Sequence, residues 1–211
     1  MIKKARPTLA WFFVACDRQS ERVCYADGVA YLEILTRCYK RPAGLARNQA
    51  SLRAQSDPDY IQTLLIDDQG IGVAAANARL ASVEPVGQYV WVLDDDDFCT
   101  DTRLIERLKM LTGTMRTAPA AVVVRMDHGE LGVLPALEDW GRAPAEGGIG
   151  ASALIVRADV WRHYADRWAS ARYASDYDFA SAVLRGETNV VWVDWVASAI
   201  SRRSIGAPEV A

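Results

Sequence analysis

The chain has 211 residues, of which 51% are hydrophobic, and its formal net charge is −3 at pH 7. This length fits one α/β domain, or one domain with a small appendage, and the hydrophobic content excludes a largely disordered chain. The slight negative charge argues against a general nucleic-acid binder, which normally has a basic excess. Two histidines are too few for a multi-histidine zinc site, and the four cysteines show no metal-type spacing. We interpret the cysteines as reduced thiols of a cytoplasmic protein.

The N-terminal segment imitates a short secretory signal, because basic residues precede the apolar run LAWFFVAC. The run is at the lower end of the expected length, however, and Asp17 and Arg18 follow it at once. We predict instead that residues 1–29 form an extension that packs on the domain as an added strand or short helix. The sequence contains no apolar stretch long enough to cross a bilayer, so we expect no integral membrane segment.

From residue 30 onward, strand-like and helix-like segments alternate. The pattern predicts strands at residues 31–37, 60–66 and 89–93, and helices at residues 45–55 and 73–82. This β-α-β-α-β order indicates an α/β fold, in which helices flank a mostly parallel central sheet in a single compact domain. Ligands of such sheets gather at the carboxyl ends of the strands.

Acidic residues follow two of these strands. Asp67 and Asp68 end the strand YIQTLLI, and four aspartates at residues 94–97 follow the apolar run YVWVL. Adjacent carboxylates repel one another and are costly to ionise together unless a cation lies among them. Carboxylate oxygens suit Mg²⁺ or Mn²⁺, which usually also bind substrate phosphates. A solvated acidic loop is the alternative, but two acidic clusters at one sheet edge favour a cation site.

The second half of the chain has a less regular pattern. We predict helices at residues 102–117, 158–168 and 176–185, and strands at residues 120–125, 151–156 and 189–195. Residues 126–148 lack periodicity and are expected to form a mobile or substrate-shaping loop.

The order of these segments resembles that of the GT-A glycosyltransferases, most like glycosyltransferase family 2. The resemblance runs from about residue 32 to residue 194 and is carried by CYKRPAGLARNQASLRAQ, YIQTLLIDD, residues 70–77, YVWVLDDDD, GASALIVRADVW, SDYDFASAVLRG and VVWVD. It implies a Rossmann-like GT-A fold with a nucleotide-sugar-binding half at residues 30–125, an acceptor-side half at 126–196 and a tail at 197–211. It also implies a metal-dependent enzyme that moves a sugar from a UDP- or GDP-linked donor to an acceptor hydroxyl with inversion. The acceptor stays open among a glycan, a lipid, a protein and a modified nucleic acid.

The resemblance places residues 94–96 at the family's DxD motif. Asp96 would hold the divalent cation, Mn²⁺ or Mg²⁺, and Asp94 would contact the metal or the donor ribose. Residues two apart in a strand point to the same side, so Asp94 and Asp96 can face one ligand. Asp95 would contribute to donor binding.

Further donor contacts are implied near the ends of the first two strands. Asp67 stands where a carboxylate hydrogen-bonds the nucleoside, and Asp68 would do the same or orient the loop. The alternative for each is an Asx turn before Gly70. Tyr39 and Arg41 stand where the family's loop meets the base and phosphates, although a tyrosine at this position could simply pack.

Asp176 is implied to be the catalytic base. It matches the aspartate of the family's Glu-Asp motif, with Ser175 in place of the glutamate, and a base must lie within hydrogen-bond reach of the acceptor hydroxyl. The alternative is a helix-capping box formed by Ser175 and Asp178, which leaves Asp176 unexplained.

The sequence departs from the family pattern in three ways. Ala76 stands where the family often has arginine, so a phosphate or base contact would come from elsewhere, for example from Arg79. Ser175 weakens the acceptor-side assignment. The tail has no histidine to complete a metal site. Its Arg202 and Arg203 would bind the diphosphate as bidentate cations, unless they are solvated tail charges.

Two other functions fit parts of the pattern. Asp-x-Asp after an apolar strand also begins phosphohydrolases of the haloacid dehalogenase type, but there this strand comes first in the core, whereas here two strands precede it. A non-catalytic nucleotide-sugar-binding module would explain Ala76 and Ser175.

Overall fold

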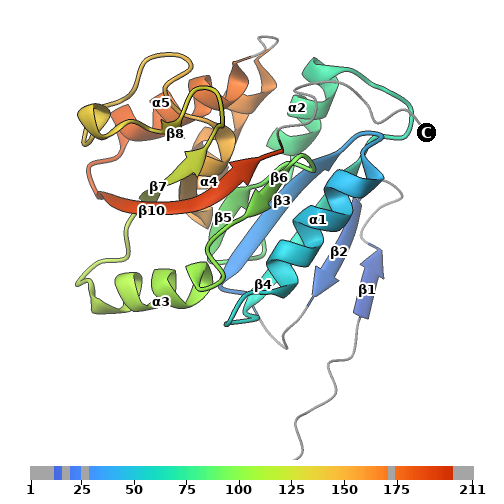
Figure 1. The fold of residues 1–211 in the computed structure, drawn as a ribbon, viewed down its shortest axis with the longest axis horizontal. Coiled ribbons are helices and arrows are strands. Elements are labelled where there is room, and N and C mark those ends of the chain that lie inside the picture. The colour runs from blue at the N-terminus through green and yellow to red at the C-terminus, as the bar shows by residue number, and fades with distance from the viewer. Residues whose placement is uncertain (1–11, 16–19, 25–28, 171–173, 202–211) are drawn as a thin grey trace, which may run out of the picture.

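The predicted alternation of strands and helices forms the centre of the molecule (Figure 1). The structure, a computed structural model, describes residues 12–15, 20–24, 29–170 and 174–201. Its first half runs through β3 (Leu32–Cys38), α1 (Pro42–Arg53), β4 (Tyr60–Ile66), α2 (Val73–Ala81) and β5 (Tyr89–Val92). Strand β3 pairs in parallel with both β4 and β5. The predicted β-α-β-α-β unit is therefore confirmed.

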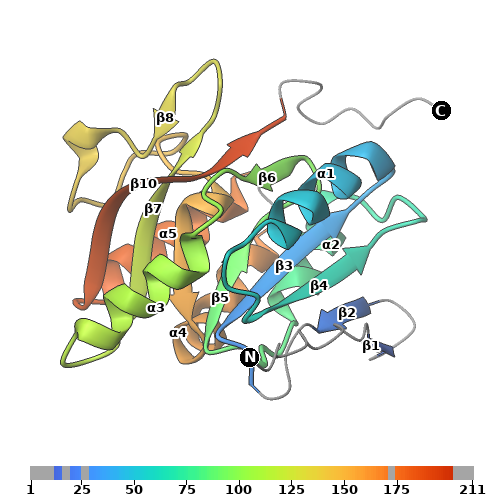
Figure 2. The same ribbon diagram turned by 60° about the horizontal axis from the view of Figure 1, so that its bottom comes forward.

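The second half adds strands to the far side of this unit. In chain order its elements are β6 (Asp97–Cys99), α3 (Leu104–Thr114), β7 (Ala121–Asp127), β8 (Val133–Leu134), η1 (Leu137–Asp139), η2 (Ala151–Ala153), β9 (Leu154–Arg157), α4 (Ala158–Tyr164), η3 (Ala165–Ala169), α5 (Ser175–Gly186) and β10 (Val190–Ile200), where η marks a 3₁₀ helix. At one edge of the sheet, β1 (Phe12–Ala15) and β2 (Ser20–Cys24) pair with each other, and β2 pairs antiparallel with β4 (Figure 2).

One curled sheet joins these strands in the order β1-β2-β4-β3-β5-β9-β7-β10-β6, and β8 pairs with β7. Strands β3, β4, β5, β7 and β10 run in one direction, while β9 lies antiparallel between β5 and β7. The chain is thus a single α/β domain whose mostly parallel sheet is flanked by helices, as predicted. Within the ranges that the structure describes, no helix is long and apolar enough to cross a membrane.

Hydrophobic residues cover both faces of the sheet, because successive residues of a strand point to opposite sides. Leu35, Val90 and Val123 belong to the core that packs against α2, α4, η3 and α5. Their neighbours Ile34, Trp91 and Val122 belong to a second core against α1 and α3. Figures 1 and 2 show these two groups of helices on opposite faces.

Several predicted boundaries differ from the structure. Helix α1 begins at Pro42 rather than at residue 45, because the first turn of a helix tolerates a proline that lacks an N–H. The helix predicted at 158–168 ends at Tyr164 and continues as the 3₁₀ helix η3. Strand β10 extends to Ile200, since its end pairs with the unpredicted strand β6.

Candidate functional site

The sequence-predicted residues meet in one cavity of about 680 Å³ at the carboxyl ends of the parallel strands. Its lining includes the predicted donor-side residues Tyr39, Arg41, Asp67, Asp94, Asp95 and Asp96 together with Asp176. Asp68 is exposed and does not line this cavity. Arg202 and Arg203 lie outside the described residues, so their contact with a diphosphate stays a prediction. Met126, His128, Leu131 and Leu134, from the segment predicted to shape the substrate site, form part of the wall.

Asp94, Asp95 and Asp96 lie in a turn between β5 and β6 and not on an extended strand. The prediction that strand alternation aligns Asp94 with Asp96 is therefore wrong, although both residues line the cavity. Strand β5 ends at Val92, and the backbone N–H of Asp97 donates to the carbonyl of Asp94 at 3.0 Å. The chain turns here because Asp97 begins β6, which pairs with the end of β10.

Helix α1 contacts the backbone of this turn. The buried amide of Asn48 donates to the carbonyls of Leu93, Asp94 and Asp97 at 3.3, 2.9 and 3.1 Å. A Cβ atom at Gly44 would lie 2.5 Å from the carbonyl oxygen of Asp95. A glycine at position 44 therefore lets the helix approach the turn closely.

Two arginines bind the carboxylates, Arg37 from the end of β3 and Arg41 from the connection between β3 and α1. Arg37 donates from Nε and Nη2 to the two oxygens of Asp94, at 2.8 and 2.5 Å. Arg41 Nη1 lies 2.9 Å from Asp95 Oδ1 and 3.2 Å from Asp96 Oδ2. The backbone N–H of Tyr39 donates to the other oxygen of Asp95 at 2.8 Å. Asp94 and Asp95 thus have both carboxylate oxygens bound by protein groups.

Burial makes these carboxyls harder to ionise. It raises the pKa of Asp95 to about 6, although Arg41 and the Tyr39 N–H oppose the rise. Burial and the neighbouring Asp94 raise the pKa of Asp96, and the same causes together with Asp96 raise that of Asp97 well above its usual value. The pKa of Arg37 is raised, because its pairing with Asp94 outweighs the opposing effect of burial.

The chemistry of the donor set suits a divalent cation, and Asp96, which lies 3.2 Å from Arg41, lines the cavity. The carboxylates of Asp94, Asp95 and Asp96 are faced by two guanidinium groups, so negative charge is in excess when all three are ionised. Carboxylate oxygens are preferred ligands of Mg²⁺ and Mn²⁺. At Asp94 a cation would have to displace Arg37. Within the part of the chain that the structure describes, no cluster of three or more His, Cys, Asp or Glu side chains is arranged to hold a metal. The metal roles of Asp94 and Asp96 therefore stay predictions.

Asp176 faces the same cavity from the first turn of α5. Burial raises its pKa, while the Tyr177 N–H and the charge of Arg37 limit the rise. Its Oδ1 accepts a hydrogen bond from the Tyr177 N–H at 2.9 Å. A half-buried carboxyl with a raised pKa is suited to accept a proton near neutral pH.

The capping-box alternative is wrong. The N-cap of α5 is Ala174, and no described side chain caps this helix. Ser175 instead lies inside the helix with its Oγ accepting from Asn77 Nδ2 at 2.7 Å. Asp178 Oδ2 accepts from Ser170 Oγ at 2.9 Å.

Asp67 forms the Asx turn that was the alternative to a nucleoside contact. Its Oδ1 accepts from the N–H of Gly70 at 2.7 Å and from the N–H of Gln69 at 3.1 Å. The N–H of Ile71 lies 3.0 Å from Oδ2. The carboxylate therefore orders the loop that begins α2, and its contact with a nucleoside stays a prediction.

Sequence reasoning missed Arg37, Asn48 and Asn77. Arg37 was assigned only to the end of a strand. A basic residue at the end of one strand and acidic residues at the end of another strand of the same sheet could have indicated an ion pair. Asn48 carries no such signal, and Asn77 was noted only through the resemblance, as the residue after Ala76. Arg79, the suggested substitute for an arginine at position 76, lines the cavity and donates to the carbonyl of Ile66 at 2.6 Å.

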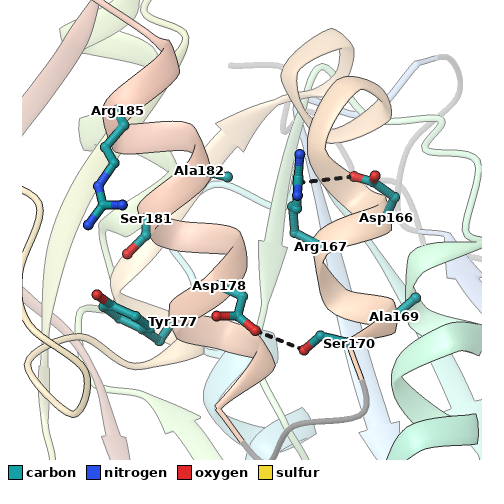
Figure 3. Close-up of a pocket in the computed structure, with 9 residues that line it drawn as sticks. All are labelled: Asp166, Arg167, Ala169, Ser170, Tyr177, Asp178, Ser181, Ala182 and Arg185. Atoms are coloured by element: carbon teal, nitrogen blue, oxygen red, sulfur yellow. Dashed lines mark hydrogen bonds and ion pairs between the residues drawn. The ribbon is translucent and has the colours of Figure 1, made fainter.

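A second cavity, of about 710 Å³, lies between η3 and α5 (Figure 3). Its lining includes Asp166, Arg167, Ser170, Tyr177, Asp178, Ser181 and Arg185, and Tyr177 also lines the first cavity. Of the predicted site residues that the structure describes, none lines this second cavity. The candidate chemistry is therefore confined to the cavity with the aspartate turn.

Comparison with known proteins identifies the fold but no sequence family. No family model and no curated protein matches the sequence. Among solved structures, the fold is similar to the mannosyltransferase PcManGT from Pyrobaculum calidifontis in complex with GDP-Man and Mn²⁺, with a TM-score of 0.55 and 14% identity over 83% of this chain. It is also similar to a glycosyltransferase involved in glycosylation of the major capsid of PBCV-1, with a TM-score of 0.52 and 8% identity over 82% of this chain.

The match covers 58% of the length of the mannosyltransferase and 93% of the PBCV-1 protein. At these identities the likeness shows a shared fold. The chain thus has the α/β fold of known glycosyltransferases, and a shared fold does not by itself determine activity.

Proposed function

We propose that the chain is a metal-dependent glycosyltransferase that moves a sugar from a UDP- or GDP-linked donor to an acceptor hydroxyl with inversion. The observation that carries this proposal is that Asp96 and Asp176 line the same cavity. A base must sit across the reacting carbon from the leaving group, and a shared cavity is the first requirement of that geometry. The fold shared with glycosyltransferases supports the same class of reaction.

On this proposal each side of the cavity has a separate task. Tyr39 and Asp67 would contact the nucleoside, and Arg41 would lie against the diphosphate. Asp96 would hold Mn²⁺ or Mg²⁺, and Asp94, still paired with Arg37, would lie beside the metal or the donor ribose. A bound cation of this kind neutralises the charge that develops on a diphosphate leaving group. The GDP-Man and Mn²⁺ bound to the structurally similar mannosyltransferase are consistent with this donor side.

Asp176 would act on the acceptor. Its carboxylate accepts the proton of the acceptor hydroxyl as that oxygen forms a bond to the anomeric carbon. The bond from this carbon to the diphosphate oxygen breaks, and its electron pair leaves with the diphosphate. Attack on the face opposite the leaving group inverts the anomeric carbon. The raised pKa of Asp176 favours its holding the proton afterwards.

The competing functions find less support in the site. In a dehalogenase-type phosphohydrolase the first aspartate of Asp-x-Asp attacks phosphorus, but both oxygens of Asp94 are bound by Arg37. A non-catalytic binding module predicts binding of a donor without turnover, which the following experiment separates from catalysis.

The test is a thermal-shift screen of UDP- and GDP-sugars with and without Mn²⁺, followed by donor hydrolysis assays. Ligands that bind the native state raise the Tm by mass action. We expect a rise that requires nucleotide sugar and Mn²⁺ together, and slow release of free sugar. Asp96→Ala should abolish the metal-dependent rise, whereas Asp176→Asn should keep the rise and lose turnover. Unchanged hydrolysis in both variants would refute the assignment, and binding without any turnover would favour the non-catalytic module.

A further inference from the structure

We propose that Arg37, Asn77 and Ser175 form a positioning relay that fixes Asp176 relative to the donor carboxylate Asp94. The relay joins β3, α2 and α5 across the cavity, and these elements are far apart in sequence. This inference rests on the proposed function, because it explains how the donor side and the acceptor side of that site are held in fixed positions.

The relay begins at Arg37, which is bound on three sides. Two of its nitrogens donate to the two oxygens of Asp94, and Nη1 donates to Asn77 Oδ1. Its guanidinium carbon also lies 5.3 Å from the centroid of the Trp168 ring, within the range of a cation–π contact. A planar fork held in this way has a single orientation, which a lysine could not reproduce.

Asn77 transmits this orientation to α5. Its side chain is fully buried, so both ends of its amide need partners. Arg37 can only donate, which requires the amide oxygen to face it and turns the amide nitrogen toward Ser175. Nδ2 accordingly donates to Ser175 Oγ at 2.7 Å. The direction of the chain of hydrogen bonds is therefore set by the arginine.

Ser175 links this hydrogen bond to the proposed base, Asp176, which is the next residue. It is 2% exposed, it is the first residue of α5, and Asp176 follows it directly. No side chain in the described ranges caps this helix. The hydrogen bond from Asn77 thus ties the first residue of α5 to α2. A displacement of about 1 Å in a catalytic group can cost on the order of 100-fold in rate.

The helix itself offers a matched control. Ser181 lies in α5, is 7% exposed, and its Oγ has no hydrogen-bond partner within the described ranges. Ser175→Ala and Ser181→Ala therefore make the same chemical change at two buried sites of one helix, and only the first breaks the relay.

The experiment measures kcat, the donor KM and the donor-induced Tm rise for Ser175→Ala, Asn77→Leu, their double variant and Ser181→Ala. For Ser175→Ala we expect kcat to fall by about 10- to 100-fold with the donor KM and the Tm rise unchanged, because donor contacts remain. The double variant should be no slower than the slower single variant, since both changes break one relay. Ser175→Thr, which keeps the hydroxyl, should recover part of kcat.

Wild-type kcat in Ser175→Ala, an equal loss in Ser181→Ala, or losses that multiply in the double variant would overturn the relay while the proposed function stands. If the wild-type protein turns over no donor, the proposed function fails. The relay is then decided by urea unfolding of the same variants, in which fully additive losses of stability at positions 77 and 175 would overturn it.

Discussion

Replacing Arg37 with methionine tests how far the aspartate turn depends on one guanidinium group. The change removes both hydrogen bonds to Asp94 and the one to Asn77 while keeping a side chain of similar length. Removing one partner of a fully buried ion pair costs about 3–5 kcal/mol. Here the two side chains keep 25% and 20% of their surface exposed, so water recovers part of this cost. We expect the free energy of unfolding to fall by about 2–3 kcal/mol, and the Tm by roughly 4–12 °C.

Urea unfolding followed by circular dichroism, at fixed pH and salt, measures this loss. Arg103→Met is the control, because the pair of Arg103 with Glu106 leaves 62% and 37% of these side chains exposed and should contribute little. Equal losses in Arg37→Met and Arg103→Met would show that the pairing with Asp94 does not stabilise the fold, and would refute the reasoning.

Three other predictions concern the same turn. Gly44→Ala places a Cβ atom 2.5 Å from the carbonyl oxygen of Asp95 and should cost about 1–3 kcal/mol. By contrast, a Cβ atom at Gly113 in α3 meets no atom within 4 Å, so Gly113→Ala should stabilise the fold by about 0.5–1 kcal/mol. Urea unfolding in which both variants change the free energy of unfolding in the same direction would contradict this. The pKa of Asp95, raised to about 6 by burial, lies above its unfolded value, so its protonated form stabilises the fold and stability declines between about pH 4 and about pH 6. The free energy of unfolding of Asp95→Asn should decline less over this range, and parallel curves for wild type and variant would count against it. Removing divalent cations with EDTA should abolish the Tm rise given by a nucleotide sugar, and Mn²⁺ should restore it; a rise that survives EDTA would argue against metal dependence.

The sequence was sufficient to predict the parallel core and the edge at which the site lies. Apolar runs such as residues 60–66 and 89–92 are local signals, and the short connections between them leave few topologies. Residues that follow parallel strands of one sheet lie at the same edge, so Asp67 and the aspartates at 94–97 were expected at one edge. The acceptor side, with Asp176, came from the resemblance to a family.

The shape of the turn and the partners of its side chains could not be predicted in the same way. Residues 94–97 look like the continuation of a strand until β10 is known to pair with Asp97. The partner of Asp94 depends on register: β3 and β5 pair Leu35 with Val92, and continuing this register sets Arg37 beside Asp94. A sequence pattern predicts that the two strands are adjacent, but the register decides which charges meet.

The way the turn is held explains how its carboxylates can serve a ligand. Asn48 binds the carbonyls of residues 93, 94 and 97, and Gly44 packs against the carbonyl of Asp95. These contacts fix the backbone without using the carboxylate oxygens. Asp96 can therefore exchange Arg41 for a ligand, while Arg37 stays on Asp94 and the turn keeps its shape. Such a turn holds its charges in place before a ligand arrives. The protein then needs little reorganisation when these charges stabilise a bound ligand or a transition state.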